Sequence, residues 1–445
     1  MCSWWRASRL LALAWLLQAS CGDEDVEGLA HDAERARELT FAMPVPVRRI
    51  SNADYAAEER ARVAKEPDAE LRSYAETYGR FGFFPVGLDL RPILATANTE
   101  TVAAYYASST GSSTGSITLL GRSSRDTIVH EFVHGLQDQH FGLSGDLEVM
   151  TSDAVMARAA VVEGDATLAQ LRYLASEEGI DFGRVSFRTA FDTYGQFTDS
   201  LLRGPFAPLF SAYASFAYTY GVAYCAANLT GATDARPIAQ LPAPFDWTRE
   251  DALFAGAMPM TTQGVLMLRA EAAPTVGLRD VPPALADRFE LVDWDSLGEW
   301  HVFLLLVPLE HCSDSCRSGT TRAMVSGWNG DGVLFVRQRE TGANGFVWAS
   351  SWTGADAAQG ISSAVAQLHG FVPGTGDPRV GLARDGEPMW LEVRDTRVVV
   401  IKNIDAAAAA AFAEAALGAN TTALATAVPS RPRSRPTLAA LLSAR

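Results

Sequence analysis

Apolar residues recur at helical spacing through much of the first half of the chain. This spacing covers residues 51–80, with a break at Pro67, and returns over residues 152–178 and 185–228. Between these segments, residues 102–122 contain two β-prone runs on either side of a turn rich in Gly, Ser and Thr, which predicts a hairpin. The pattern therefore predicts a mainly helical domain with a short hairpin or edge sheet.

The pattern changes at about residue 285. Short apolar runs such as "GVLFVRQRE" and "RVVVIKN" then alternate with turns and with helical pieces. We therefore expect an α+β fold in two parts, a mainly helical domain over residues 41–284 and a smaller α+β module over residues 285–425. The last residues, 426–445, mix Pro, Ser and Arg and predict a disordered tail.

The first twenty residues have the layout of an export signal. Arg6 and Arg9 form a short basic start, an apolar run follows at residues 10–17, and the small residues Ala19 and Ser20 close the segment. The apolar run is far shorter than the roughly 20 residues that cross a bilayer. We therefore expect residues 1–20 to be a signal peptide that is removed.

The residue after this segment is Cys21. The stretch "LLQASCG" resembles the lipobox of bacterial lipoproteins, in which that cysteine carries a lipid, and plain secretion is the alternative. The acidic residues 21–40 that follow predict a solvated tether. No other segment predicts a membrane span, because the apolar run at residues 302–309 is short enough to be a core element.

Charge narrows the classes of partner. The chain of 445 residues has a formal net charge of −15, whereas nucleic-acid binding depends on clustered Lys and Arg that neutralise phosphates. We therefore exclude nucleic acid as a partner. We expect the chain to meet a membrane only through a lipid at Cys21.

The other cysteines predict one local disulfide. Cys312 and Cys316 lie in the polar segment "EHCSDSCRSG", and an oxidising compartment favours a bond between them. A metal pair with His311 is the alternative, although a fourth ligand is not evident. Cys225 lies in an apolar stretch and is expected to be a buried free thiol.

The candidate chemistry lies in residues 124–143, "SRDTIVHEFVHGLQDQHFGL". Residues four apart on an α-helix share a face, so His130 and His134 can direct their imidazoles at one point. Glu131, one residue further round, can reach a water at that point without displacing it. A catalytic zinc ion needs such ligands and an open position for water, with a carboxylate as general base.

The surroundings of this motif suit a helix. Ser123 or Ser124 is a suitable N-cap, and Gly142 is a suitable end. A strand expected at residues 116–120 leads into the helix, and a strand beside the active-site helix is where zincins bind an extended substrate by strand addition. Two surface histidines on an amphipathic helix are the alternative.

The third ligand has two candidates. His140 gives "HEFVHGLQDQH" the overall spacing of the metzincin pattern, but Gln137 stands where that pattern has a helix-breaking glycine. In an unbroken helix His140 lies about 120° away from His134, so it would miss the metal. We therefore favour Glu163 in "MARAAVVEGDATLAQL".

Glu163 has apolar or small helical neighbours, and an ionised carboxylate on such a face is unfavourable unless it meets a cation or a metal. An ion pair with Arg158 or Arg172 is the alternative. Gly164 lowers helix propensity by about 1 kcal/mol relative to alanine, which makes sense if two helices approach closely there. Asp165 points to the other side of the helix and is expected to make an outer-shell or inter-helix contact.

Two histidines on one helix and a glutamate on the next resemble the gluzincins, the thermolysin-like zinc metallopeptidases. The chain is also similar to a family of largely uncharacterised prokaryotic surface and secreted proteins in which His-Glu-x-x-His is followed by Ala-Leu-Gln-Asp-Gln. Gly135 stands here in place of that alanine. The similarity extends over much of residues 103–358 through these motifs: "YYASSTG", "VVEGDA", "YTYG", "LPAPFDWTRED", "DSLGE", "GWNGDG" and "SSWTGADA".

The resemblance implies a zincin-like metallopeptidase domain followed by an α+β module. It implies a Zn²⁺ cofactor held by His130, His134 and Glu163, with Glu131 as general base and a peptide or protein as substrate. The family's Thr-Glu pair is split here, because Arg249 separates Thr248 from Glu250. Any role of that loop is therefore open.

A peptidase also needs a donor for the oxyanion of its tetrahedral intermediate. Tyr218 or Tyr220 could supply it, but tyrosines in an aromatic-rich helical segment are more often core residues, and we expect them to be core. A group of residues in the module could line a binding surface, but tryptophans beside β-prone runs are more often core, and we expect packing: Trp328, Asp331, Trp348, Trp352 and Asp356.

Two other functions compete with peptide hydrolysis. The first is a catalytically silent zincin-fold surface lipoprotein with a binding or structural role in the envelope. Such a protein would not require Glu131. The second is a structural zinc site, which usually closes with a fourth Cys or His ligand.

Overall fold

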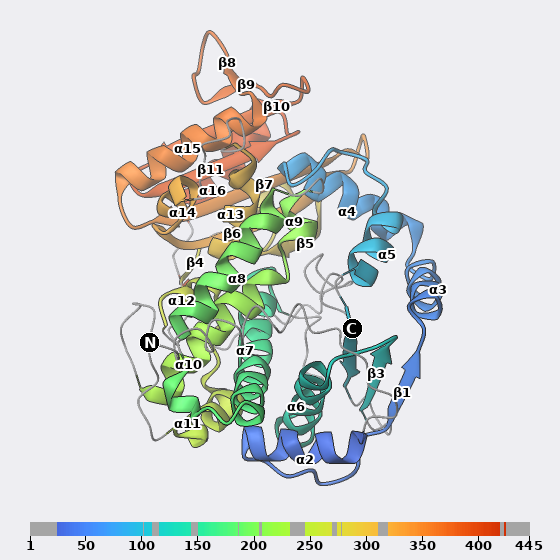
Figure 1. Ribbon diagram of the computed structural model, residues 1–445. Coiled ribbons are helices and arrows are strands. Elements are labelled where there is room, and N and C mark those ends of the chain that lie inside the picture. Colours follow the sequence, from blue (N-terminus) through green and yellow to red (C-terminus); the bar gives the residue numbers. More distant parts are fainter. Residues whose placement is uncertain are drawn as a thin grey trace.

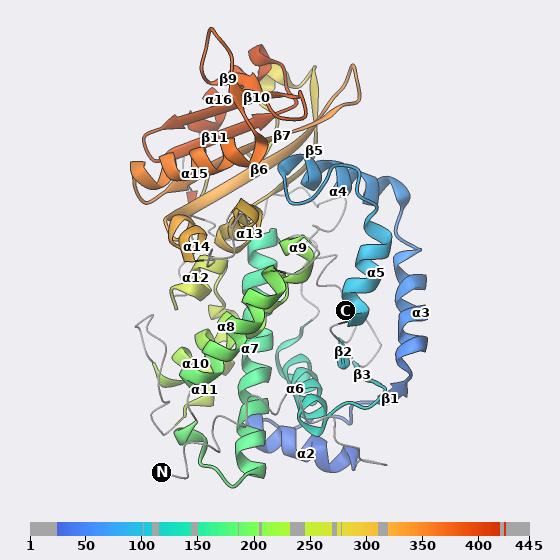
Figure 2. The ribbon, with the colours of Figure 1, turned by 45° about the horizontal axis from the view of Figure 1, so that its top comes forward.

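The computed structural model describes residues 25–100, 102–108, 115–143, 150–185, 187–203, 207–231, 245–268, 274–276, 278–309, 319–418 and 422–423. The fold is α+β, as expected, with a helical body and a sheet-rich module at one end (Figures 1 and 2). The expected signal peptide, Cys21, the expected Cys312–Cys316 disulfide and the expected tail at 426–445 lie outside the described residues. Within those residues no helix has both the length and the apolar character that a membrane span requires.

The helical body contains eleven α-helices among the described residues: α2 (Val26–Arg37), α3 (Asn52–Val63), α4 (Asp68–Phe81), α5 (Leu90–Glu100), α6 (Arg125–Phe141), α7 (Ser152–Glu177), α8 (Phe187–Leu202), α9 (Pro208–Ser211), α10 (Val222–Thr230), α11 (Trp247–Ala252) and α12 (Thr262–Leu266). The expected break at Pro67 is confirmed, because this residue precedes α4. Ser51 caps α3 by accepting a hydrogen bond from the backbone N–H of Asp54.

The expected hairpin is part of a three-stranded sheet. β2 (Ala104–Ala107) pairs antiparallel with β3 (Ser116–Leu120). A third strand, β1 (Val47–Ile50), pairs in parallel with the other side of β3. β3 is therefore a central strand, and the expectation that it offers an edge for strand addition is wrong because its neighbours already take its backbone hydrogen bonds.

Residues 26–37 do not form a solvated tether. They form α2, which packs against α6 and α7 at the base of the body (Figure 1). Leu29, Ala33 and Ala36 are buried on its inner face. Apolar residues four and three positions apart supply a core-facing stripe, and this stripe outweighs the high charge on which the tether prediction depended.

The module contains a seven-stranded antiparallel sheet in the order β5-β6-β7-β11-β10-β9-β8. Its strands are β5 (Phe289–Asp295), β6 (Trp328–Gln338), β7 (Asn344–Trp352), β8 (Val372–Pro373), β9 (Val380–Leu382), β10 (Pro388–Arg394) and β11 (Arg397–Lys402). Its helices are α13 (Gly298–Leu306), α14 (Gly319–Val325), α15 (Ala355–His369) and α16 (Ala406–Gly418). A short pair, β4 (Pro274–Thr275) and β12 (Thr422–Ala423), is separate from this sheet.

Alternate residues of β11 face two different cores. Val398 and Val400 belong to the core that also fills the helical body, whereas Val399 and Ile401 pack with α16 in a second core. Helix α13 is buried along its whole length, which confirms that the apolar run near residue 302 is a core element. Trp328, Trp348, Trp352 and Asp331 of the module are buried, as expected for packing residues. The same expectation is wrong for Asp356, which is exposed in the first turn of α15.

The first turn of α7 joins the body to the module through buried carboxylates. We call Asp153, Asp295, Glu299 and Asp331 the junction cluster; all four are nearly inaccessible to solvent. Asp295 accepts from the backbone N–H of Ser152 at 2.8 Å, and Asp153 accepts from the backbone N–H of Thr262 at 2.7 Å. Asp331 accepts from Ser296 Oγ and Trp348 Nε1 and from backbone N–H groups of the turn at 297–298.

Further along α7, the prediction of a close helix contact at Gly164 is confirmed. A Cβ atom there would lie 2.4 Å from the carbonyl carbon of Gly221. Gly221 ends a π-helical turn, η3 (Ala217–Gly221), which continues into α10. The absence of a side chain at both glycines lets this turn lie directly against the part of α7 that carries Glu163.

Candidate metal centre

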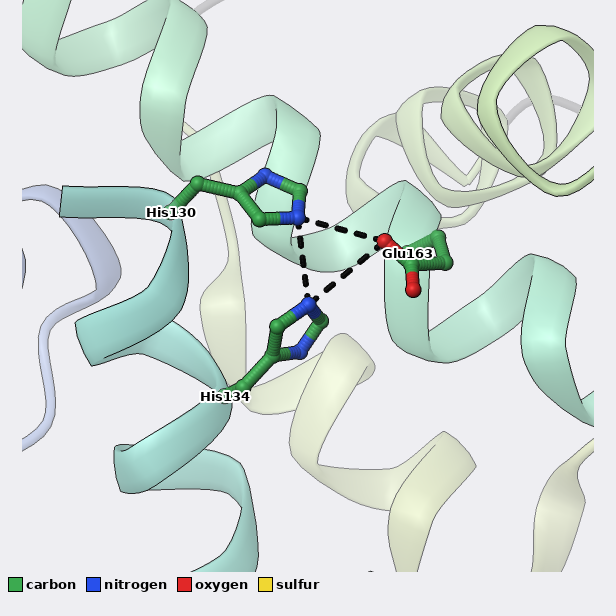
Figure 3. Close-up of side chains that lie close together, drawn as sticks. All are labelled: His130, His134 and Glu163. Atoms are coloured by element: carbon green, nitrogen blue, oxygen red, sulfur yellow. Dashed lines mark hydrogen bonds and ion pairs between the residues drawn. The ribbon is translucent and has the colours of Figure 1, made fainter. Parts of the chain in front are cut away.

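Helix α6 positions the two histidines. It begins after Ser124 and ends at Gly142, as the sequence predicts. His130 and His134 lie one turn apart on its buried face, and their Nε2 atoms are 3.1 Å from each other. Figure 3 shows the two rings directed at a common point.

Helix α7 brings Glu163 to the same point. Its Oε2 lies 3.2 Å from His130 Nε2 and 3.5 Å from His134 Nε2 (Figure 3). The alternative ion pairs do not form, because Arg158 donates to the carbonyl oxygens of Gly142 and Leu143, and Arg172 donates to Ala36 and Glu38. Glu163 is therefore directed at the histidines.

The separations of the three ligand atoms are compatible with a tetrahedral metal site. Ligand atoms about 2.0–2.1 Å from a tetrahedral zinc ion are about 3.3–3.4 Å from one another. The observed separations of 3.1, 3.2 and 3.5 Å agree with this spacing. Within the described part of the chain, no other group of three His, Cys, Asp or Glu residues has its ligand atoms this close together.

The charges of the cluster favour an ionised carboxylate. Burial alone would raise the pKa of Glu163, but the two imidazoles hold that pKa well below its usual value. Burial likewise opposes a charge on His134, yet Glu163 and then Glu131 raise the pKa of this histidine to about 9. In the absence of a metal ion, the cluster therefore attracts a positive charge.

Glu131 lies beside the cluster but is not part of the ligand set. It follows His130 on α6, and it is 7% exposed. Its carboxylate is close enough to contribute to the raised pKa of His134. The role of Glu131 as a general base stays a prediction.

His140 is not a ligand. Helix α6 continues unbroken through this residue, so its ring turns away from the other two histidines. His140 Nε2 lies 2.8 Å from the carbonyl oxygen of Thr40 instead. The metzincin-like alternative is thereby excluded by geometry.

The two candidate tyrosines lie in different surroundings. Tyr220 is in the core, where its ring contacts Phe216 and Trp300, as expected. Tyr218 is only partly buried, and the centroid of its ring is 6.2 Å from that of His130. The expectation that both are core residues is wrong for Tyr218, because the π-helical turn carries residues two apart to different faces.

Two residues that the sequence interpretation did not assign to the site are connected with His134. Gln137 Oε1 lies 2.8 Å from His134 Nδ1, and Gln137 Nε2 donates to Asp165 at 2.7 Å. Arg37, from α2, lies 2.8–2.9 Å from both oxygens of Asp165. Asp165 thus makes the outer-shell contact that we expected of it. The spacing of three residues between His134 and Gln137 was the feature of the sequence that indicated a contact between these two side chains.

The segment around Thr248 lies behind this network. Thr248 bonds with the N-cap residue Asp246, whereas Glu250 is buried and accepts from Asn228 at 3.0 Å. Burial, reinforced by the charge of Asp165, raises the pKa of Glu250 to about 8. This segment therefore packs on α10 and places Glu250 near Asp165. Cys225, near it, is a buried free thiol, as expected.

Comparisons with known proteins concern the module. A family described as a domain of unknown function (DUF8575) matches residues 287–417, which lie inside the predicted module at 285–425. Searches of curated proteins and of solved structures found no match. The group of His130, His134 and Glu163, carried by α6 and α7, lies outside the matched range.

Proposed function

We propose that this protein is a zinc-dependent metallopeptidase with a gluzincin-type ligand set. His130, His134 and Glu163 would hold the Zn²⁺ ion, and a peptide or protein would be the substrate. The observation that carries the proposal is the convergence of the two Nε2 atoms and one carboxylate oxygen within 3.5 Å. Glu131 beside them distinguishes a catalytic site from a purely structural one.

When bound, zinc supplies a Lewis acid that acidifies water and polarises a carbonyl group. Glu131 accepts the proton of the attacking water and passes it to the amine of the leaving product. Its burial favours this role, because a carboxylate shielded from solvent interacts more strongly with a nearby proton. Glu163, already held ionised by two imidazoles, has no proton to exchange.

Tyr218 supplies the second donor in this proposal. Its ring lies near His130 on the turn that packs against Gly164. A phenolic O–H at this position can donate to the oxyanion that forms during attack. Replacement of Tyr218 by Phe should lower kcat by about 10–100-fold, somewhat less than the loss of a stronger oxyanion-hole donor, without weakening zinc binding.

The test is hydrolysis of an unstructured protein by the purified chain. Activity should vanish with a chelator and return with zinc. Glu131→Gln should retain zinc and abolish hydrolysis, whereas His134→Ala should lose both. Wild-type zinc binding without hydrolysis would favour the catalytically silent lipoprotein, and equal hydrolysis by Glu131→Gln would refute the assignment of the base.

We also propose that the chain is exported and anchored in the bacterial envelope by a lipid on Cys21. Helix α2 begins at Val26, so few residues separate this cysteine from the folded body. The anchor would then hold the body close to the membrane surface. Metabolic labelling with a radioactive fatty acid should mark the wild-type chain and fail to mark Cys21→Ser.

A further inference from the structure

We propose that Arg37 of the N-terminal helix is a positioning residue for His134 and acts through Asp165 and Gln137. This inference rests on the proposed metal site. It concerns which nitrogen of the imidazole carries the proton, and therefore which nitrogen is left to bind a metal.

The chain of contacts starts with a buried ion pair. Arg37 and Asp165 have no exposed side-chain surface. Arg37 Nη2 also donates to Asp251 at 2.8 Å, and its guanidinium lies 4.8 Å from the ring centroid of Trp247. A guanidinium can only donate hydrogen bonds, and Arg37 Nε lies 2.8–2.9 Å from both oxygens of Asp165, so this carboxyl group acts as an acceptor.

The acceptor oxygens around Gln137 fix the orientation of its side-chain amide. Gln137 Nε2 faces two acceptors, Asp165 Oδ2 at 2.7 Å and the carbonyl oxygen of Val162 at 3.0 Å. A rotation of the amide by 180° would place its oxygen against both of these oxygens, which is unfavourable. The amide oxygen must therefore face away from α7.

The amide oxygen in turn selects the tautomer of His134. Gln137 Oε1 lies 2.8 Å from His134 Nδ1 and can only accept, so Nδ1 must carry the proton. A neutral imidazole with a proton on Nδ1 has a free lone pair on Nε2. That nitrogen is the one that faces His130 and Glu163.

A second arginine provides a matched control. Arg172 also holds α2, because it donates to the carbonyl oxygen of Ala36 and to Glu38, and it lies 5.7 Å from the Trp247 ring centroid. Its hydrogen bonds do not go to Asp165. Arg172→Met therefore removes a contact with the same helix and leaves the path to His134 intact.

The experiment compares zinc affinities, measured by competition with a chelator, for the full chain and its variants. Arg37→Met and Gln137→Met should each weaken zinc binding by about 10–100-fold, the usual effect of losing an outer-shell partner. Arg172→Met should bind zinc as the wild type does. Gln137→Met leaves the buried ion pair in place, so it tests the inference even if Arg37→Met does not fold.

A second measurement needs no metal. Nitrogen NMR of the metal-free chain at alkaline pH, where imidazole is neutral, should show the proton of His134 on Nδ1 in the wild type and on both nitrogens in Asp165→Asn. The inference would be overturned, and the proposed function left standing, by either of two results. One is an unchanged zinc affinity in folded Gln137→Met, and the other is a mixture of tautomers of His134 in the wild type. A wild-type chain that binds no zinc would overturn the proposed function and the inference with it.

Discussion

Helix α7 carries a partly buried carboxylate, Glu163, and a buried one, Asp153, and the two behave in opposite ways. Near its middle, Glu163 faces two imidazoles, which hold its pKa well below the usual value. At its start, Asp153 faces hydroxyl and backbone N–H groups and other carboxylates of the junction cluster. Burial and these neighbouring acids raise the pKa of Asp153 to about 8.

The difference depends on the partners of the carboxylates and not on the number of acidic residues. Burial also raises the pKa of Glu299 to about 8 and that of Asp331 to about 6. The junction cluster has more carboxylates than the group of His130, His134 and Glu163, but neutral donors already bond to Asp153, Asp295 and Asp331. Glu163 instead shares its space with two nitrogen ligands, which a cation can bridge.

The largest effect is expected at the junction. Asp331→Ala would leave the donors Trp348 Nε1 and Ser296 Oγ and two backbone N–H groups without their acceptor. Since each orphaned buried donor costs about 1–3 kcal/mol, the free energy of unfolding should fall by at least about 3 kcal/mol. Urea denaturation of the metal-free chain measures this change. Zinc affinity of the folded variant should not change, and a large loss would contradict the separation of the two clusters.

Glu163→Gln should affect zinc affinity more than stability, which is the reverse of what we expect for Asp331→Ala. It removes a ligand charge, so zinc affinity should fall by more than the roughly 100-fold that loss of an outer-shell partner causes. Above pH about 9, where His134 is neutral, the unfolding free energy of the metal-free chain should change little, because the amide can still bond with the imidazoles. Metal analysis beside the wild type and Glu163→Ala provides the check. A variant that retains full zinc affinity would remove Glu163 from the ligand set.

The junction cluster should also make stability depend on pH. The pKa of Asp153 is raised in the folded state, so its contribution is fully present below pH about 4 and is lost as pH rises to about 8. A tenfold change in a proton-binding constant corresponds to about 1.4 kcal/mol, and we expect Asp153→Asn to recover about 1–2 kcal/mol of that loss at pH 8. Denaturation of the metal-free chain at pH 5 and pH 8 tests this. If the unfolding free energies of the variant and the wild type changed equally between pH 5 and pH 8, the pH dependence would not come from Asp153.

An effect of similar size is expected between the two clusters, at Gly164. A methyl group there would meet the backbone of Gly221, and such overpacking lowers stability by about 1–3 kcal/mol. Gly195→Ala in α8 is the control, because no atom lies within 4 Å of its Cβ position. That change should raise stability by about 0.5–1 kcal/mol. Thermal unfolding of both variants gives the comparison.

The sequence was sufficient to predict those features of the candidate site that depend on residues close together in the chain. The limits of α6 follow from Ser124 and Gly142, and the direction of His130 and His134 follows from helical periodicity. Glu163 could be identified because a charged residue on an apolar helical face needs a partner. In each case neighbouring residues along the chain contain the whole reason.

The contacts between distant segments could not be found in this way. Arg37 and Asp165 are 128 positions apart, and no local pattern joins them. β1 has only four residues and depends on β3 for its pairing, so its own sequence is too short to predict a strand. In α2, three small or apolar residues decide the packing, although charged residues dominate the segment.

The shared core has a consequence for how the molecule unfolds. Val129 of α6 and Val161 of α7 belong to the same hydrophobic cluster as Phe335 and Val400 of the module. The range that matches a protein family, 287–417, is thus a unit of sequence but not a unit of packing. We expect both parts to melt in one cooperative transition, and a fragment that ends before the module to expose apolar surface and aggregate.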